Sequence, residues 1–98
     1  LVPKRGVYST VTLIDNKTYN SITNIGVKPT VEKDIKPLAE THILDFSGNL
    51  YGKEIEVRFN KFIRDEKKFS SLDELKIQIK KDIEYVRKQS EMSELHRL

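Results

Sequence analysis

Alternating apolar and polar positions predict strands along the first two thirds of the chain. Residues 6–14 (GVYSTVTLI) alternate and are rich in β-branched side chains, which suit a pleated, half-buried surface. A turn cluster follows at 15–17, and residues 18–25 resume the alternation, which predicts a hairpin. The pattern returns at 40–46 and at 54–64. We therefore expect an antiparallel sheet of at least four strands.

The strand region carries two further expectations. Residues 26–38 lose the alternation and contain Gly26, Pro29 and Pro37, which predicts a long loop of the kind that is often functional. Within 54–64, one face of the predicted strand carries four apolar side chains, namely Ile55, Val57, Phe59 and Ile63.

Near residue 70 the spacing of apolar residues changes from every second position to about every 3.6 positions, which predicts a helix. Ser70 or Ser71 offers an N-cap, with an acid three residues later at Asp73 or Glu74. We expect the helix to span about 71–89, with an apolar stripe of Leu72, Leu75, Ile79, Ile83 and Val86 facing the sheet. The predicted fold class is mostly β with one C-terminal helix, and closure of a small curled sheet or barrel would hide its edges.

Composition narrows the possible functions. Ninety-eight residues suit one domain over 1–98 and leave no room for a second core. The absence of cysteine excludes a disulfide framework and a thiolate zinc site, and it suits the cytoplasm. No apolar run approaches the roughly 20 residues of a membrane helix. The net charge of +3 could attract phosphate, but dense basic runs typical of dedicated nucleic-acid binders are missing.

Few residues suggest chemistry by pattern alone. The sequence has none of the usual glycine-rich phosphate motifs, and His42 and His96 each lack a second ligand at metal spacing, so we assign no metal ligand. Glu40 opens a predicted strand directly after the long loop, where a carboxylate could act as a general base or be an ordinary surface acid. The basic cluster at 64–68 beside Phe69 could hold an aromatic or phosphorylated ligand, or be a solvated turn.

Several short motifs occur in a fixed order along the chain. They are Gly6-Val7-Tyr8, NIGxxPT at 24–30, Glu40-Thr41-His42 before Asp45-Phe46, Leu50-Tyr51-Gly52-Lys53, Phe62-Ile63-Arg64 with Glu66, Phe69 and Ser71, and helix residues Leu75, Ile79 and Asp82. Taken in order, these motifs resemble the riboflavin kinase family, specifically the kinase domain of bacterial bifunctional riboflavin kinase/FAD synthetase. The resemblance runs from about residue 3 to residue 87.

The resemblance implies a small six-stranded antiparallel Greek-key barrel with a C-terminal helix. It also implies transfer of the ATP γ-phosphate to the ribityl 5'-hydroxyl of riboflavin, giving FMN and ADP. The family's catalytic base corresponds to Glu40. ATP contacts correspond to Ile43, Asp45 and Tyr51, and flavin contacts correspond to Arg64, Lys67 and Phe69. A carboxylate at Glu40 would be suitable for phosphoryl transfer, because it could orient the attacking substrate hydroxyl and accept its proton.

The sequence departs from the family in one respect. Members carry an earlier strand ending in Pro-Thr-Ala-Asn, whose Thr and Asn hold Mg2+, whereas this sequence begins after that point. We therefore expect the first strand and the Mg2+ ligands upstream of Leu1, and feeble or absent FMN formation by residues 1–98 alone. The resemblance also implies an FMN adenylyltransferase domain fused at the N-terminal side in the native protein.

Two other functions stay open on the sequence. One is a non-catalytic flavin or nucleotide sensor that retains the fold, which turnover assays would separate from a kinase. The other is a small basic barrel that binds single-stranded nucleic acid by stacking on Tyr8, Tyr19 and Tyr51. Few aromatic residues and many interleaved acids count against it, so we expect neither a nucleic-acid nor a membrane partner.

Overall fold

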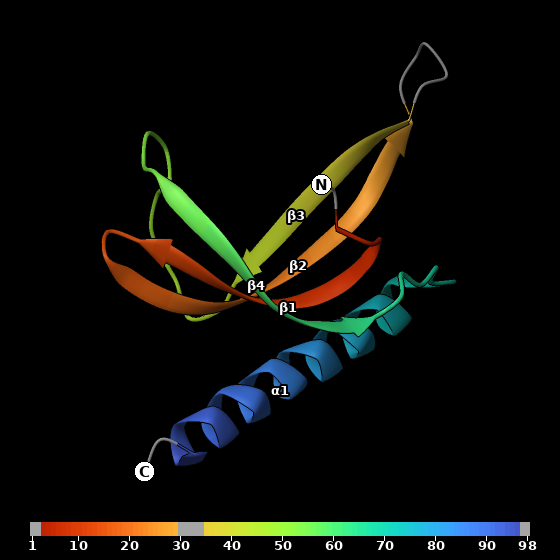
Figure 1. Cartoon of the computed structure of the whole chain (residues 1–98). Coiled ribbons are helices and arrows are strands. Elements are labelled where there is room, and N and C mark those ends of the chain that lie inside the picture. The colour runs from red at the N-terminus through yellow and green to blue at the C-terminus, as the bar shows by residue number, and fades with distance from the viewer. Residues whose placement is uncertain (1–2, 30–34, 97–98) are drawn as a thin grey trace.

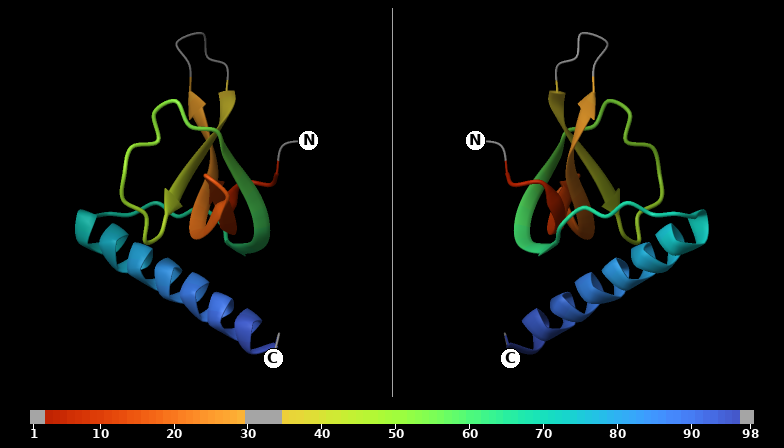
Figure 2. Two further views of the ribbon diagram at one scale, coloured as in Figure 1. Left: turned by 90° about the vertical axis from the view of Figure 1, so that its left-hand side faces the viewer. Right: turned by 90° about the vertical axis from the view of Figure 1, so that its right-hand side faces the viewer.

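One curled antiparallel sheet and one helix make up the computed structural model, which describes residues 3–29 and 35–96 (Figure 1). The elements are β1 (Gly6–Ile14), β2 (Lys17–Pro29), β3 (Ile35–Ile43), β4 (Ile55–Arg64) and α1 (Leu72–His96). The strand order is β3-β2-β1-β4, so β3 and β4 are the outer strands. The mostly-β fold with a C-terminal helix is confirmed. The described strands form an open four-stranded sheet rather than a closed barrel, and the segment 44–54 passes from one outer strand to the other (Figure 2).

The β1–β2 hairpin is confirmed, with a two-residue turn at Asp15 and Asn16. Both residues have positive φ, at 50° and 66°, which is the geometry of a type I′ turn. Asp and Asn tolerate this left-handed backbone better than other side chains do. The register pairs Ile14 with Lys17 at the turn and Gly6 with Ile25 at the far end.

The prediction of a long loop at 26–38 is wrong at both ends of that range, where the structure has strands. β2 continues to Pro29 and β3 begins at Ile35, so that Val27 pairs with Pro37. Proline lacks a backbone N–H, but it is tolerated in an outer strand such as β3. The remainder of the predicted loop, 30–34, lies outside the described residues.

β4 contains two irregularities that break the alternation expected from the sequence. The register with β1 shifts twice, leaving Asn60 and Ile63 without a partner in β1. The alternation therefore holds only as far as Phe59. Beyond it, Phe62 instead of Ile63 shares the face of Phe59, and both rings meet Tyr8 edge-on, at centroid distances of 5.1 and 5.3 Å.

Helix α1 begins at the predicted serine pair. The Ser71 hydroxyl accepts the Glu74 backbone N–H at 3.2 Å, while the Glu74 carboxylate accepts both the N–H and the hydroxyl of Ser70. The Ser70 hydroxyl, and then its backbone N–H, lower the pKa of Glu74. The helix ends at His96, beyond the predicted 89, since no Gly or Pro interrupts it.

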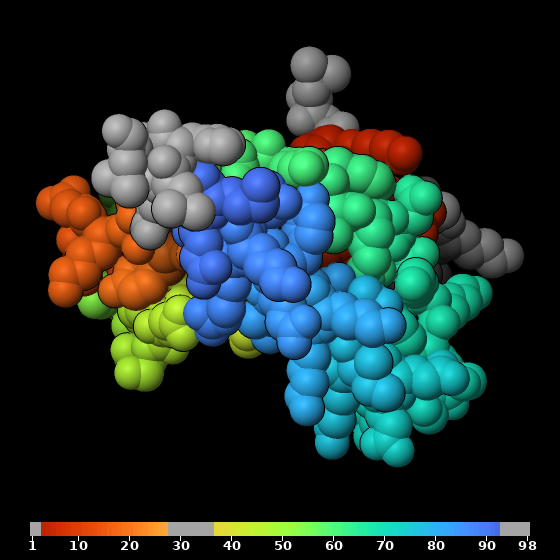
Figure 3. All heavy atoms as spheres, turned by 90° about the horizontal axis from the view of Figure 1, so that it is seen from below, coloured from red at the N-terminus to blue at the C-terminus, as the bar shows by residue number. Residues whose placement is uncertain are grey.

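The helix lies along one face of the sheet and contacts β2 (Figures 1 and 3). Asp82 and Val86 are its buried side chains among those described, whereas Leu72 and Ile77 stay exposed. The rest of the buried apolar core comes from the sheet and from the residue after β3, namely Val7, Ile14, Ile25 and Leu44. Among the described residues, no helix is long and apolar enough to cross a membrane.

Candidate functional site

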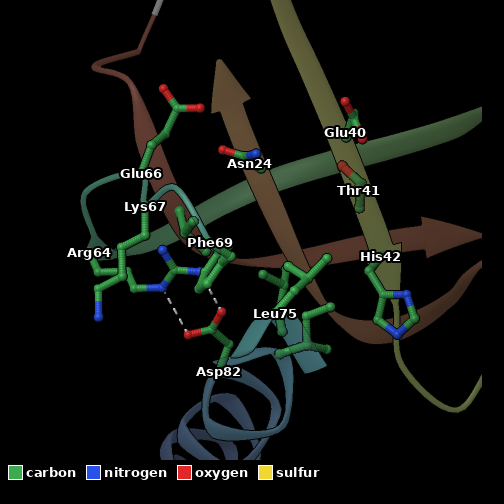
Figure 4. A pocket seen from close by; sticks show the side chains of 13 residues that line it. Asn24, Glu40, Thr41, His42, Arg64, Glu66, Lys67, Phe69, Leu75 and Asp82 are labelled. Carbon is green, nitrogen blue, oxygen red and sulfur yellow. Dashed lines mark hydrogen bonds and ion pairs between the residues drawn. The ribbon is translucent and has the colours of Figure 1, made fainter. Parts of the chain in front are cut away.

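A cleft of about 460 Å³ lies between β3 and the segment that joins β4 to α1 (Figure 4). β2 crosses its floor, and α1 borders it below. Four of the seven predicted site residues line it, namely Glu40, Arg64, Lys67 and Phe69. The other lining residues are Val7, Ile22, Asn24, Thr41, His42, Glu66, Leu75, Ile79 and Asp82. The structure thus brings the predicted base and the predicted flavin contacts to one cavity.

Glu40 lies on the outer strand β3, where its side chain is exposed. The register pairs it with Asn24 of β2, and the next pair on the same face of the sheet joins His42 to Ile22. Directly opposed residues of an antiparallel pair point to the same face of a sheet. A carboxylate, an amide and an imidazole are therefore presented together on the cleft side.

Arg64 links three elements at the side of the cleft opposite β3. Its Nε and Nη2 donate to the two carboxylate oxygens of Asp82 at 3.1 and 2.9 Å, and its Nη1 donates to the Asp65 carbonyl at 3.0 Å. The side chain of Arg64 is 19% exposed and that of Asp82 only 7%. Gln78 donates to the same carboxylate at 3.0 Å. Most N–H donors of the Arg64 guanidinium thus fix the segment between β4 and α1 to the helix. Few of these donors are left to bind a ligand.

The segment after Arg64 is held from two further sides. The Glu66 carboxylate accepts the Arg5 Nε at 2.9 Å, and its other oxygen lies over Gly26, 2.8 Å from where a β-carbon would be. Lys67 donates to Gln78 of α1 at 3.4 Å. The half-buried ring of Phe69 is therefore carried by a segment that follows β4 directly and is anchored to Arg5, just before β1, and to α1.

The three predicted ATP contacts do not line this cleft. Ile43 ends β3, and the strand predicted to continue to residue 46 stops there because Asp45 has a φ of 58°. Asp45 accepts two hydrogen bonds from Arg87 of α1, at 2.8 and 3.1 Å. These bonds lower the pKa of the Asp45 carboxyl and raise the pKa of Arg87. Tyr51 is 94% exposed on the 44–54 segment. Their ATP role stays a prediction.

Sequence reasoning gave no role to several cleft residues. Asn24 and His42 reach the site through the β2–β3 register, and Thr41 lies between the two cleft-facing residues of β3. The sequence signal for Asn24 was its place in the NIGxxPT motif, whereas its position opposite Glu40 follows from the strand pairing. The sequence signal for Asp82 was its place among the helix motif residues, four positions after Gln78.

Within residues 3–29 and 35–96, no group of three His, Asp or Glu side chains could hold a metal ion.

Comparison with known proteins identifies the chain's relatives. The bifunctional riboflavin kinase/FMN adenylyltransferase of Haemophilus influenzae is 45% identical over 83 residues, covering 84% of this chain and 27% of the relative. The Escherichia coli protein of the same name is 44% identical over 81 residues, covering 82% and 26%. The RNA-binding riboflavin kinase RibR of Bacillus subtilis is 38% identical over 89 residues, covering 91% and 39%. The chain thus spans about a quarter of the bifunctional relatives.

A solved structure shares the fold. The crystal structure titled as a macrolide-efflux protein from Streptococcus pneumoniae superposes with a TM-score of 0.79 at 33% identity, covering 87% of this chain and 28% of that one. The family described as Flavokinase, riboflavin kinase, matches residues 1–90. With nearly the whole chain matched, this protein belongs to the riboflavin kinase family.

Proposed function

We propose that the protein transfers the γ-phosphate of ATP to the ribityl 5'-hydroxyl of riboflavin, giving FMN and ADP, with residues 1–98 as its kinase domain. Family membership over residues 1–90 and the names of the relatives support this activity. The observation that carries it is the cleft itself, in which an exposed carboxylate, Glu40, faces the segment bearing Lys67 and Phe69. Its volume of about 460 Å³ lies within the range of small-molecule sites.

Glu40 is the proposed general base. In the reaction, the ribityl oxygen forms a bond to the γ-phosphorus, and the bond from that phosphorus to the bridging oxygen of ADP breaks. The hydroxyl proton passes to the Glu40 carboxylate. Because the transition state of phosphoryl transfer is loose, such an enzyme acts mainly by positioning groups and stabilising charge. A carboxylate on a rigid strand suits that task, since the backbone of β3 fixes its position.

Phe69 and Lys67 are the proposed flavin contacts. The half-buried Phe69 ring offers a flat apolar partner for the isoalloxazine ring, and Lys67 offers a hydrogen-bond donor. We assign Arg64 mainly to positioning these two residues, because most of its donors are engaged by Asp82 and Asp65.

ATP is the proposed donor, with Ile43, Asp45 and Tyr51 as its proposed contacts. Mg2+ is the proposed metal, which would neutralise charge on the phosphates when bound. We assign it to no residue of this chain and route no step through it.

An FMN adenylyltransferase activity in the same polypeptide is proposed as well. Relatives from two bacteria carry both activities in their names, and this chain matches about a quarter of each. FMN made in the cleft would then be the substrate of that second activity.

The test of the base compares Glu40→Gln with the wild-type protein in a steady-state assay of FMN formation. We expect kcat to fall by about 10²- to 10⁴-fold, with the dissociation constant of riboflavin nearly unchanged. Glu84→Gln is the matched control, because Glu84 is an exposed acid of α1 that does not line the cleft. Wild-type turnover in the Glu40→Gln protein would show that another group takes the proton.

A further inference from the structure

A continuous chain of five side-chain hydroxyls crosses the sheet from β1 to the outer strand β3. In order it runs Thr12, Ser21, Thr10, Thr23 and Thr41, with oxygen to oxygen distances of 2.8, 2.7, 3.0 and 2.8 Å. The first four residues are at most 1% exposed, whereas Thr41 is exposed and lines the cleft. The chain therefore begins in the interior and ends at the site.

The number of hydrogens fixes the direction of these bonds. Each hydroxyl has one hydrogen to donate, so five hydroxyls bring five hydrogens to four bonds, and one hydrogen is left over. These four contacts are the only hydrogen bonds that the five hydroxyls make with other described residues. If the spare hydrogen belonged to a buried member, it would be a buried unsatisfied donor, costing about 1–3 kcal/mol. Only one arrangement avoids this cost.

In that arrangement every buried hydroxyl donates toward β3. Thr12 donates to Ser21, the donation passes along the chain, and Thr23 finally donates to Thr41. The Thr41 oxygen accepts, so its own hydrogen is free to donate outward. A donor at the end of such a chain is strengthened by the polarisation of the bonds behind it.

The position of Thr41 indicates which ligand atom it meets. It follows Glu40 directly in β3, so the two side chains lie on either side of the same outer strand (Figure 4). Glu40 is an acceptor on one face of β3, suited to the hydroxyl that attacks, and Thr41 is a fixed donor on the other face of the same strand. Hydrogen bonds to charged acceptors are roughly twice as strong as neutral ones, and donors aimed at oxygens that carry charge in the transition state lower the barrier.

We infer that the Thr41 hydroxyl donates a hydrogen bond to a phosphoryl oxygen of the nucleotide, an inference that rests on the proposed kinase function. Because the Thr41 oxygen accepts from Thr23, its own hydrogen is not used within the chain and stays available to donate to the nucleotide.

The test uses Thr41→Val, which keeps the side-chain shape and removes the donor, and Thr41→Ser, which restores it. Thr12→Val is the matched control, because removing the buried end still leaves three hydroxyls donating toward Thr41. We expect kcat for FMN formation to fall about 10- to 100-fold in Thr41→Val and to return to within about threefold of wild type in Thr41→Ser. Thr12→Val should stay within about twofold of wild type. Thermal unfolding checks that each variant is folded at the assay temperature.

A second readout, titration with a non-hydrolysable ATP analogue, separates this inference from the proposed function. Wild-type kcat and analogue affinity in Thr41→Val would overturn the inference and leave the kinase assignment intact. If the full-length wild-type protein makes no FMN, the kinase assignment fails, and a selective loss of analogue affinity in Thr41→Val would still support the phosphoryl contact. Equal affinities, or no analogue binding at all, would then overturn the inference too.

Discussion

The ion pair between Arg64 and Asp82 gives the sharpest stability prediction. Asp82→Asn keeps the shape of the side chain but removes the negative charge that holds the Arg64 guanidinium at 2.9 and 3.1 Å. Removing one partner of a buried pair costs about 3–5 kcal/mol, because the other charge is left uncompensated. Arg64 is 19% exposed and keeps its bond to the Asp65 carbonyl, so water and that carbonyl offset part of the cost. We expect a loss of about 3 kcal/mol, near the low end of that range.

The assay is urea or thermal unfolding followed by circular dichroism. For a domain of this size, a loss of about 3 kcal/mol lowers Tm by roughly 10 to 20 °C. Glu56→Gln is the control, because the Arg58–Glu56 pair is 66% and 59% exposed and such surface pairs contribute about 0–1 kcal/mol. Riboflavin affinity should also fall in Asp82→Asn at temperatures where the protein is folded, since Arg64 positions the segment with Phe69. A loss no larger than that of Glu56→Gln would refute the reasoning.

Three further predictions concern other parts of the chain. Because Arg87 lowers the pKa of Asp45, their pair stabilises the fold above the ordinary Asp pKa and loses this effect as pH falls through the lowered value. The Tm difference between wild type and Asp45→Asn should therefore shrink from about pH 5 to about pH 2, and a constant difference would contradict this. Gly6→Ala should lower the free energy of unfolding in urea by about 2–4 kcal/mol. The reason is that Gly6 has a φ of 147° and that a β-carbon there would lie 2.7 Å from the Arg64 carbonyl oxygen. An unchanged urea midpoint would show that the backbone relaxes to accept the methyl group. Phe69→Ala should weaken riboflavin binding more than ATP binding, and equal losses by titration would indicate that Phe69 is only part of the core.

Local rules accounted for much of the fold. The alternation of residues 6–14 gave β1 with its observed bounds, because that segment is flanked by Gly6 and a strong turn. The serine pair with Glu74 located the helix start, since capping depends on neighbours in sequence. Both features are determined by contacts within a few residues.

Features that depend on distant contacts could not be read in this way. Gly26 looked like a loop residue, yet it lies in β2, where it pairs with Leu38 of β3. Pro37 looked like a strand breaker, and only its place in an outer strand makes it compatible with β3. The neighbour of Glu40 in the site, Asn24, follows from a register that the sequence pattern does not contain. The candidate base itself came from the family resemblance, since the pattern alone favoured an ordinary surface acid at this position.

The most direct test of the kinase assignment follows the γ-phosphate itself. The full-length protein, rather than residues 1–98 alone, is incubated with riboflavin, Mg2+ and ATP labelled in the γ-phosphate, and the flavin products are separated and identified. We predict that the label appears on the ribityl 5'-oxygen as FMN, in step with ADP formation, and that this transfer is slowed by about 10²-fold or more in Glu40→Gln. Binding of riboflavin without labelled FMN, or release of the label only as inorganic phosphate, would contradict the assignment and favour a flavin or nucleotide sensor.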